Sequence, residues 1–196
     1  AAILEELGII DEILYAHPKD LQDNKIQVTE NDVLANVPFV EGCGLWFDHH
    51  SSENERLDLK GRYKGAGEPA DSAARVISNY YRTDHGERLD KFKELLQVVD
   101  IADSARFTEA DILEPKGWMM LAFITDPRSG LGYHRDFTVS NFQLMKTVPN
   151  LLRTKNAEEI LAMPDFKERV VLYNSEAAKY KQFLRDNVRL EGAAIV

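Results

Sequence analysis

The sequence predicts an α/β protein in which a parallel-sheet domain is followed by a helical connector. Short apolar runs suited to strands fill residues 11–50, and helical spacing of apolar residues dominates from residue 70 onward. No internal repeat or low-complexity tract interrupts this order. We therefore expect a sheet domain over residues 1–135, a helical region and linker over 136–190, and the first strand of a further domain over 191–196.

The N-terminal segment is expected to hold the end of a helix and three strands. The apolar residues of the first turns follow helical spacing until Gly8. Residues 11–17, 23–32 and 43–50 are predicted as strands, because their apolar residues alternate or run almost continuously. Such runs are typical of a sheet that is covered on both faces.

The remaining chain is predicted to be mostly helical. Small and aromatic residues recur at helical spacing from Ala70 to Tyr81, after a glycine- and proline-containing entry. A second helix should end near Leu96, with Asp100 and Asp103 at its end or just beyond it. Further helices are predicted within the segments 117–127, 140–154, 156–163 and 165–189.

Composition narrows the function. The 196 residues carry a formal net charge of -9, which disfavours a long basic track for nucleic acid. The single cysteine, Cys43, fits a reducing compartment, and no segment resembles a membrane span or a secretion signal, so we predict a cytoplasmic protein. The chain begins within a helical pattern, without methionine, and stops in a strand-like run, so we expect it to be part of a longer protein.

Chemistry-bearing residues gather at the end of the third predicted strand, in the stretch Asp48-His49-His50. Imidazole and carboxylate ligands together suit Mn, Fe, Co or Zn, and ligands bind at the carboxyl end of strands in open α/β sheets. Asp32 is predicted to end the preceding strand, and Asp103 lies on a segment that can return to the same edge. The alternative is that these are ordinary polar residues of strand ends, turns and caps.

At this point the sequence resembles the DHH phosphoesterases, a family that includes RecJ-type exonucleases, oligoribonucleases, cyclic-dinucleotide phosphodiesterases, exopolyphosphatase-like proteins and family II pyrophosphatases. The resemblance rests on "FDHH", on Asp32 in "TENDVLANVPF", and on "ADSARF" as the later Asp-Ser/Thr-x-x-Phe element. The stretch "GEPADSAARVI" is similar to the helix start that follows the naming motif in oligoribonuclease-like members. The match spans roughly residues 1–135, which would make them a DHH-type catalytic domain.

The resemblance implies a role for each matched residue. Asp32 would bridge two divalent cations, usually Mn, and His49 and Asp103 would complete the shell of the second. His50 would face the substrate phosphate, and Asp48 would orient the histidines from behind. The cations would polarise the phosphoryl oxygens and activate the attacking water.

One element of the family pattern does not match. The first motif, His-x-x-x-Asp-x-Asp, supplies most ligands of the first metal in the family, and the stretch "HPKDLQD" offers only His17, Asp20 and Asp23 at other spacings. We expect the motif, with the first strand, to lie upstream of Ala1. The glycine-rich substrate-binding domain of the family would follow the chain's other end.

Two residues are weaker candidates for substrate binding. Arg56 could hold a phosphate near the metal motif, although an arginine in a charged loop is more often solvated. Ser72 could donate its hydroxyl to a phosphate at a helix N-terminus, although capping is the commoner role.

The function predicted from these observations is metal-dependent hydrolysis of short oligoribonucleotides or small nucleotide phosphodiesters. Two alternatives stay open: a phosphoanhydride hydrolase acting on pyrophosphate or polyphosphate, and a non-catalytic nucleotide-binding regulator that keeps the fold. The expected partners are a small phosphorylated substrate and two divalent ions, with no membrane and no long nucleic acid. The oligomeric state is open, a homodimer being one option.

Overall fold

The computed structural model describes the chain from residue 1 to 195, apart from 51–58, 60, 128–131, 133 and 192–193; residue 196 is also left out. It forms two compact units. Unit 1 comprises Ala1–Glu114 and Val148–Thr154, and unit 2 comprises Pro115–Thr147 and Lys155–Val196. These compact units do not coincide with the domains predicted from the sequence, whose limits were residues 135 and 190. The domain limits stay a prediction.

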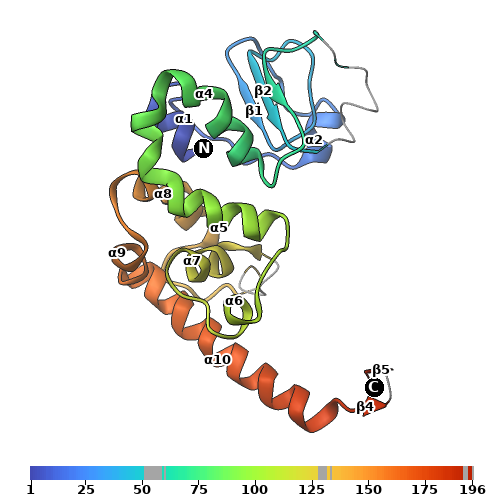
Figure 1. Ribbon diagram of the computed structural model, residues 1–196, viewed down its shortest axis with the longest axis vertical. Helices are drawn as coiled ribbons and strands as arrows, with labels where there is room; N and C mark the ends of the chain where they lie inside the picture. The colour runs from blue at the N-terminus through green and yellow to red at the C-terminus, as the bar shows by residue number, and fades with distance from the viewer. Residues whose placement is uncertain (51–58, 60, 128–131, 133, 192–193, 196) are drawn as a thin grey trace. The chain divides into compact units, whose positions relative to one another are not determined.

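Unit 1 contains a small sheet with helices around it (Figure 1). Its elements along the chain are α1 (Ala2–Leu7), α2 (Pro18–Gln22), β1 (Val33–Ala35), β2 (Leu45–Asp48), β3 (Gly65–Gly67), α4 (Ala73–Leu89), the 3-10 helix η1 (Asp90–Phe92), α5 (Lys93–Asp103) and α6 (Glu109–Leu113). The helix predicted at the start is confirmed, and it ends where Gly8 takes the left-handed conformation with φ 71°.

The three strands form a parallel sheet in the order β1-β2-β3, which confirms the α/β class. Val33 lies opposite Leu45 and Ala35 opposite Phe47, while Trp46 lies opposite Gly65. The strands predicted over residues 11–17 and 23–32 are wrong: the first segment is bend and coil, and the second is mostly turn and coil. A segment becomes a strand only when it hydrogen-bonds to a neighbouring strand, and the apolar pattern of the sequence does not reveal whether such a neighbour exists.

Side chains of the central strand alternate between the two faces of the sheet. Phe47 is fully buried against α4, where it packs with Val76 and Ile77 and meets the Tyr80 ring at 5.2 Å between centroids. Trp46 is equally buried in the cluster on the other face, and its indole N–H donates to the Val37 carbonyl at 2.9 Å. Burial on both faces fixes the strand in register, and with it the residues that follow.

The strand β3 has the sequence Gly-Ala-Gly because the neighbouring tryptophan leaves no room for side chains. A Cβ at Gly67 would lie 2.5 Å from the Trp46 ring, and one at Gly65 would lie 2.2 Å from the Trp46 carbonyl oxygen. Gly65 also has a φ of 112°, which disfavours other residues. A strand without an apolar side chain at either end carries no sequence signal, so β3 was not predicted.

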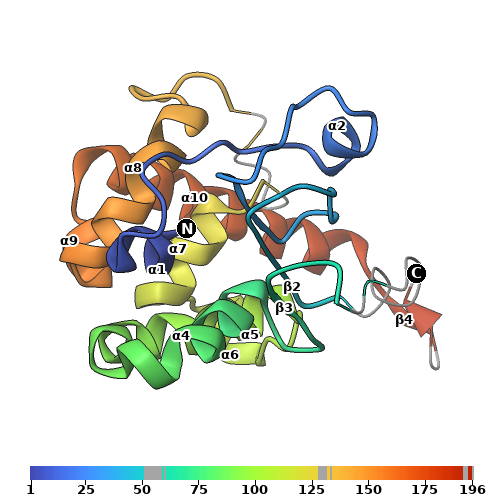
Figure 2. The ribbon, with the colours of Figure 1, turned by 90° about the horizontal axis from the view of Figure 1, so that it is seen from above.

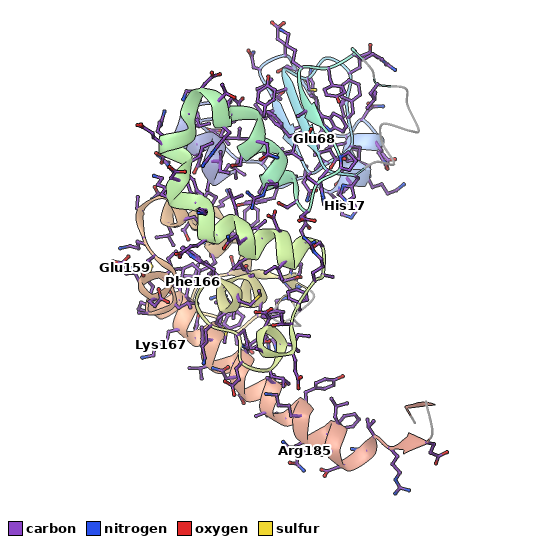
Figure 3. All side chains as sticks on the ribbon, viewed as in Figure 1. His17, Glu68, Glu159, Phe166, Lys167 and Arg185 are labelled. Atoms are coloured by element: carbon purple, nitrogen blue, oxygen red, sulfur yellow. The ribbon has the colours of Figure 1, made fainter. Side chains whose placement is uncertain are left out.

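Unit 2 is mainly helical, with α7 (Gly117–Thr125), the first half of α8 (Asn141–Thr154), α9 (Ala157–Leu161) and α10 (Pro164–Asn187), followed by the antiparallel pair β4 (Leu190–Glu191) and β5 (Ala194–Ile195). The helices predicted in this region are confirmed. Phe166, labelled in Figure 3 near the start of α10, belongs to its buried core. Among the described residues, no helix is both long and apolar enough to span a membrane.

A buried arginine organises the interior of unit 2. The Arg169 guanidinium is fully enclosed and donates to the Val139 carbonyl at 2.6 Å and to Asn141 Oδ1 at 2.8 Å, and it lies 4.0 Å from the centroid of the Phe137 ring. Burial lowers the pKa of Arg169, and its ion pair with Glu168 opposes that shift. With its donors bonded inside the unit, Arg169 has a structural role.

Candidate active site

The stretch Asp48-His49-His50 lies at the carboxyl edge of the sheet, where β2 ends, as predicted. Asp48 is the last strand residue and is 3% exposed. Its Oδ1 lies 2.9 Å from Nδ1 of His50, whose side chain is 57% exposed. A buried carboxylate thus holds an imidazole whose other nitrogen is available at the surface.

His49 is held in one orientation and one tautomer. Its Nδ1 lies 3.0 Å from the carbonyl oxygen of Ala70, and because a carbonyl can only accept, Nδ1 carries the proton and donates. In the neutral ring, Nε2 therefore has a lone pair. This nitrogen is buried and lies 3.2 Å from Oδ2 of Asp103, without the geometry of a hydrogen bond.

This arrangement fits a divalent cation. Two electron-pair donors, Nε2 of His49 and Oδ2 of Asp103, face the same small region, and among the described residues no hydrogen-bond donor reaches Nε2. Histidines that bind metals typically donate one ring N–H to a carbonyl or carboxylate and bind the metal with the other nitrogen. His49 has the same carbonyl contact, and its other nitrogen lies beside a carboxylate. Donor atoms of Asp48, His49 and His50 also lie within 4.8 Å of one another.

The position of Asp103 adds to the negative potential. It is the last residue of α5, where backbone carbonyls give a helix a partial negative charge, so a carboxylate is unfavourable there without a cation. Asp100 lies in the same last turn, and the turn has no basic residue. Asp100 is paired with Arg75, whereas Asp103 lies within ion-pair distance of His49. The imidazole of His49, the carboxylate of Asp103 and the carboxyl end of α5 therefore all favour a bound cation.

The residues that end the two outer strands complete the carboxyl edge. Asn36 follows β1 with a positive φ of 58°, and its backbone N–H donates to the Phe47 carbonyl at 2.9 Å. Glu68 follows β3, and its N–H donates to the Asp48 carbonyl at 3.2 Å (Figure 3). Polar residues that follow the ends of β1, β2 and β3 thus lie at this edge.

The prediction that Asp32 ends its strand beside His49 is wrong. Asp32 precedes β1, at the amino edge of the sheet, where its carbonyl accepts from the Gly44 N–H at 2.9 Å. Gly44 lies four residues before Asp48, which corresponds to ~13 Å along a strand. The Asp32 carboxylate accepts from the backbone N–H and the hydroxyl of Thr29, at 2.7 and 2.8 Å. Its structural role is to close a turn.

We expect Asp32→Ala to lower the free energy of unfolding by ~1 kcal/mol, because two local hydrogen bonds are lost, and to leave the Kd for Mn unchanged. Urea denaturation and titration calorimetry measure the two quantities. Asp103→Asn is the matched control, which should weaken Mn binding instead. A large rise in Kd for Asp32→Ala would restore its assignment as a metal ligand.

The two predicted substrate-binding residues have different outcomes. Ser72 is the N-cap of α4 and is 1% exposed; its hydroxyl accepts from the Arg75 backbone N–H at 3.0 Å and donates to Asp100 Oδ1 at 2.7 Å. The hydroxyl is thus buried and bonded within the protein, which supports the capping alternative, and its contact with a phosphate stays a prediction. Arg56 lies outside the described residues, and its role stays a prediction.

Three residues near the site were not singled out as functional by sequence reasoning: Ala70, Arg75 and Asp100. Ala70 contributes a backbone carbonyl, for which no side-chain pattern exists. Arg75 and Asp100 form a partly buried ion pair across 25 positions of the chain. The one available signal was an aspartate in the otherwise apolar stretch that ends α5, which predicts a buried partner.

A comparison with solved structures finds a protein described as the pGpG-specific phosphodiesterase PggH from Vibrio cholerae. The two share 33% sequence identity with a TM-score of 0.82, and the match covers 99% of the present chain. The chain spans 61% of the length of that phosphodiesterase. No family model and no curated protein matches the sequence. The similarity shows a shared fold and supports the phosphoesterase class at a coarse level.

Proposed function

We propose that the chain is the core of a DHH-type, metal-dependent phosphodiesterase that hydrolyses short oligoribonucleotides or small nucleotide phosphodiesters. The observation that carries the proposal is the facing pair of His49 Nε2 and Asp103 Oδ2, 3.2 Å apart beside the FDHH stretch. The similarity to a pGpG-specific phosphodiesterase supports a small linear dinucleotide as the substrate class. The net charge of -9 supports short substrates over long ones.

Each residue of the site has a proposed task. His49 and Asp103 hold a divalent cation, for which manganese is our first choice because the ligands mix nitrogen and oxygen. When bound, such a cation would supply Lewis-acid chemistry that polarises the phosphoryl oxygens toward attack by water. His50, which Asp48 orients through Nδ1, moves a proton at Nε2 next to the reacting phosphate. Ala70 keeps His49 in the tautomer that binds metal.

The remaining ligands are a further part of the proposal. Divalent transition metals take about four to six donors, and His49 with Asp103 provides two. We propose that the family's His-x-x-x-Asp-x-Asp motif, on residues outside this sequence, supplies others and brings the number of metals to two. Arg56 is proposed to bind a substrate phosphate.

Substrate length tests the proposal. We expect the full-length protein to hydrolyse dinucleotides to pentanucleotides with a shallow salt dependence, and to lose efficiency on RNA of about 20 nucleotides, because affinity comes from a few local groups. Each further single-strand phosphate neutralised would steepen the salt dependence by about 0.7 log unit per log unit of salt. The measurement is kcat/KM against RNA length at two salt concentrations, with Mn present.

Three other results would redirect the assignment. Efficiency that rises with length, together with a steep salt dependence, would indicate a nuclease that follows long strands. Hydrolysis of pyrophosphate or polyphosphate, with no activity on any oligonucleotide, would favour the phosphoanhydride hydrolase. Loss of all turnover with Mn bound and nucleotide bound would indicate the regulatory alternative.

A further inference from the structure

The Asp100 carboxylate lies in a dense polar cluster behind the metal site. It is 8% exposed and accepts three hydrogen bonds, from Ser72 Oγ at 2.7 Å and from Nε and Nη2 of Arg75 at 2.9 and 2.5 Å. We name these three residues, Ser72, Arg75 and Asp100, the Asp100 cluster. Compared with apolar packing, a buried ion pair such as Arg75 with Asp100 adds little to the free energy of unfolding. Its directional hydrogen bonds, however, hold the two side chains in one relative orientation.

The cluster joins the first turn of α4 to the last turn of α5. Ser72 caps α4 and Arg75 is three residues further along, while Asp100 lies on α5. Asp100 and Asp103 are three residues apart, so their side chains leave the same side of the helix. Figure 2 shows α4 and α5 side by side, and residues of the two helices are in contact. The cluster therefore constrains the helix end that carries Asp103.

The same short segment before α4 also holds His49. The Ala70 carbonyl accepts from His49 Nδ1 at 3.0 Å, and Asp71 forms an ion pair with Arg106, three residues beyond Asp103. Consecutive residues of one segment thus contact the imidazole and both sides of the Asp103 position. The separation of His49 Nε2 from Asp103 Oδ2 is set through this segment.

We infer that Asp100, acting with Ser72 and Arg75, is a positioning residue that sets the separation of His49 and Asp103 and thereby the affinity of the site for its cation. The inference rests on the proposed function, because it requires a cation between these two residues. Outer contacts of this kind typically change metal affinity by about 10- to 100-fold when they are removed.

The test uses two variants and a matched control. Asp100→Asn keeps the side-chain shape and removes the charge that pairs with Arg75. Ser72→Ala keeps that charge and removes the hydroxyl that donates to Asp100 and accepts from the Arg75 backbone N–H. The control is Asp90→Asn, which breaks the ion pair between Asp90 and Arg82, also an α4 arginine, at 2.7 Å on an exposed surface. Mn binding to the full-length protein is measured by titration calorimetry well below the Tm of each variant.

We expect the Kd for Mn to rise about 10- to 100-fold in Asp100→Asn, less in Ser72→Ala, and by less than about twofold in Asp90→Asn. If Asp100→Asn does not fold, the Kd for Mn of Ser72→Ala tests the positioning role. A lower Tm with an unchanged Kd in the folded variants would overturn the positioning role alone, since the wild type would still bind. Absence of Mn binding by the wild type would overturn the proposed function, and this inference with it.

Discussion

His50→Ala in the full-length protein should lower kcat about 100-fold and leave the metal content close to that of the wild type. The reason is that Nδ1 of His50 is hydrogen-bonded to the buried Asp48, while the ring is half-exposed. Its Nε2 is therefore suited to proton transfer to or from the substrate. Loss of one acid/base group usually costs about two to four orders of magnitude. Steady-state kinetics on a dinucleotide, with elemental analysis of the purified variant, measures both quantities.

Two further variants make this prediction specific. Asp48→Asn should lower kcat at least about tenfold, because an amide no longer fixes the His50 tautomer as a carboxylate does. His85→Ala is the matched control, since His85 lies at the kink of α4 and its ring is 6.2 Å from that of Tyr81; its kcat should change by less than about twofold. Metal loss in His50→Ala as large as in His49→Ala would assign both histidines to the cation.

The helices could be predicted from the sequence because their apolar residues repeat over several turns. α5 buries apolar residues on one side and α7 buries most of its residues, whereas α10 buries Phe166 and Arg169 near its start and is largely exposed further along. The strands of the sheet contain only three or four residues, which is too short for alternation to identify them. The central strand was found because Trp46 and Phe47 are large and fully buried on opposite faces.

The same shortness explains the misplaced aspartate. The strand was predicted over residues 23–32, whereas β1 spans Val33–Ala35. Asp32 was therefore expected at the carboxyl edge and lies at the amino edge, while Asn36 occupies the expected place. By contrast, His49 directly follows a well-defined strand and Asp103 ends a long amphipathic helix, and the structure brings these two together. The end of that helix was predicted near Leu96, whereas α5 continues to Asp103, so this boundary was wrong.

The contacts behind the site could not be predicted, since they depend on tertiary packing. Ser72 could be recognised as a cap, but its burial and its bond to Asp100 require α4 and α5 to lie together. The carbonyl of Ala70 could not be recognised at all, because any residue provides one. Such contacts nevertheless fix the tautomer of His49 and the end of α5.

The largest effect is expected for the facing pair itself. His49→Ala removes the nitrogen donor and Asp103→Asn removes the charged oxygen donor, so each should raise the Kd for Mn by at least about 100-fold and lower kcat/KM at limiting Mn by about three orders of magnitude. Unlike His50→Ala, these variants should recover part of their activity at high Mn, because the defect is in binding the cation. Titration calorimetry and kinetics across a Mn series distinguish the cases.

The tautomer of His49 gives this last prediction a readout independent of activity. Nδ1–H donates to Ala70, so Nε2 is the nitrogen that meets the cation, and the ring 15N signals of His49 should show a protonated Nδ1 and a metal-sensitive Nε2. A diamagnetic ion such as Zn should shift the Nε2 signal in the wild type and leave it unshifted in Asp103→Asn at equal ion concentration. A signal that responds equally in both proteins would separate Asp103 from the cation, and a proton shared between His49 and Asp103 would then explain their 3.2 Å contact.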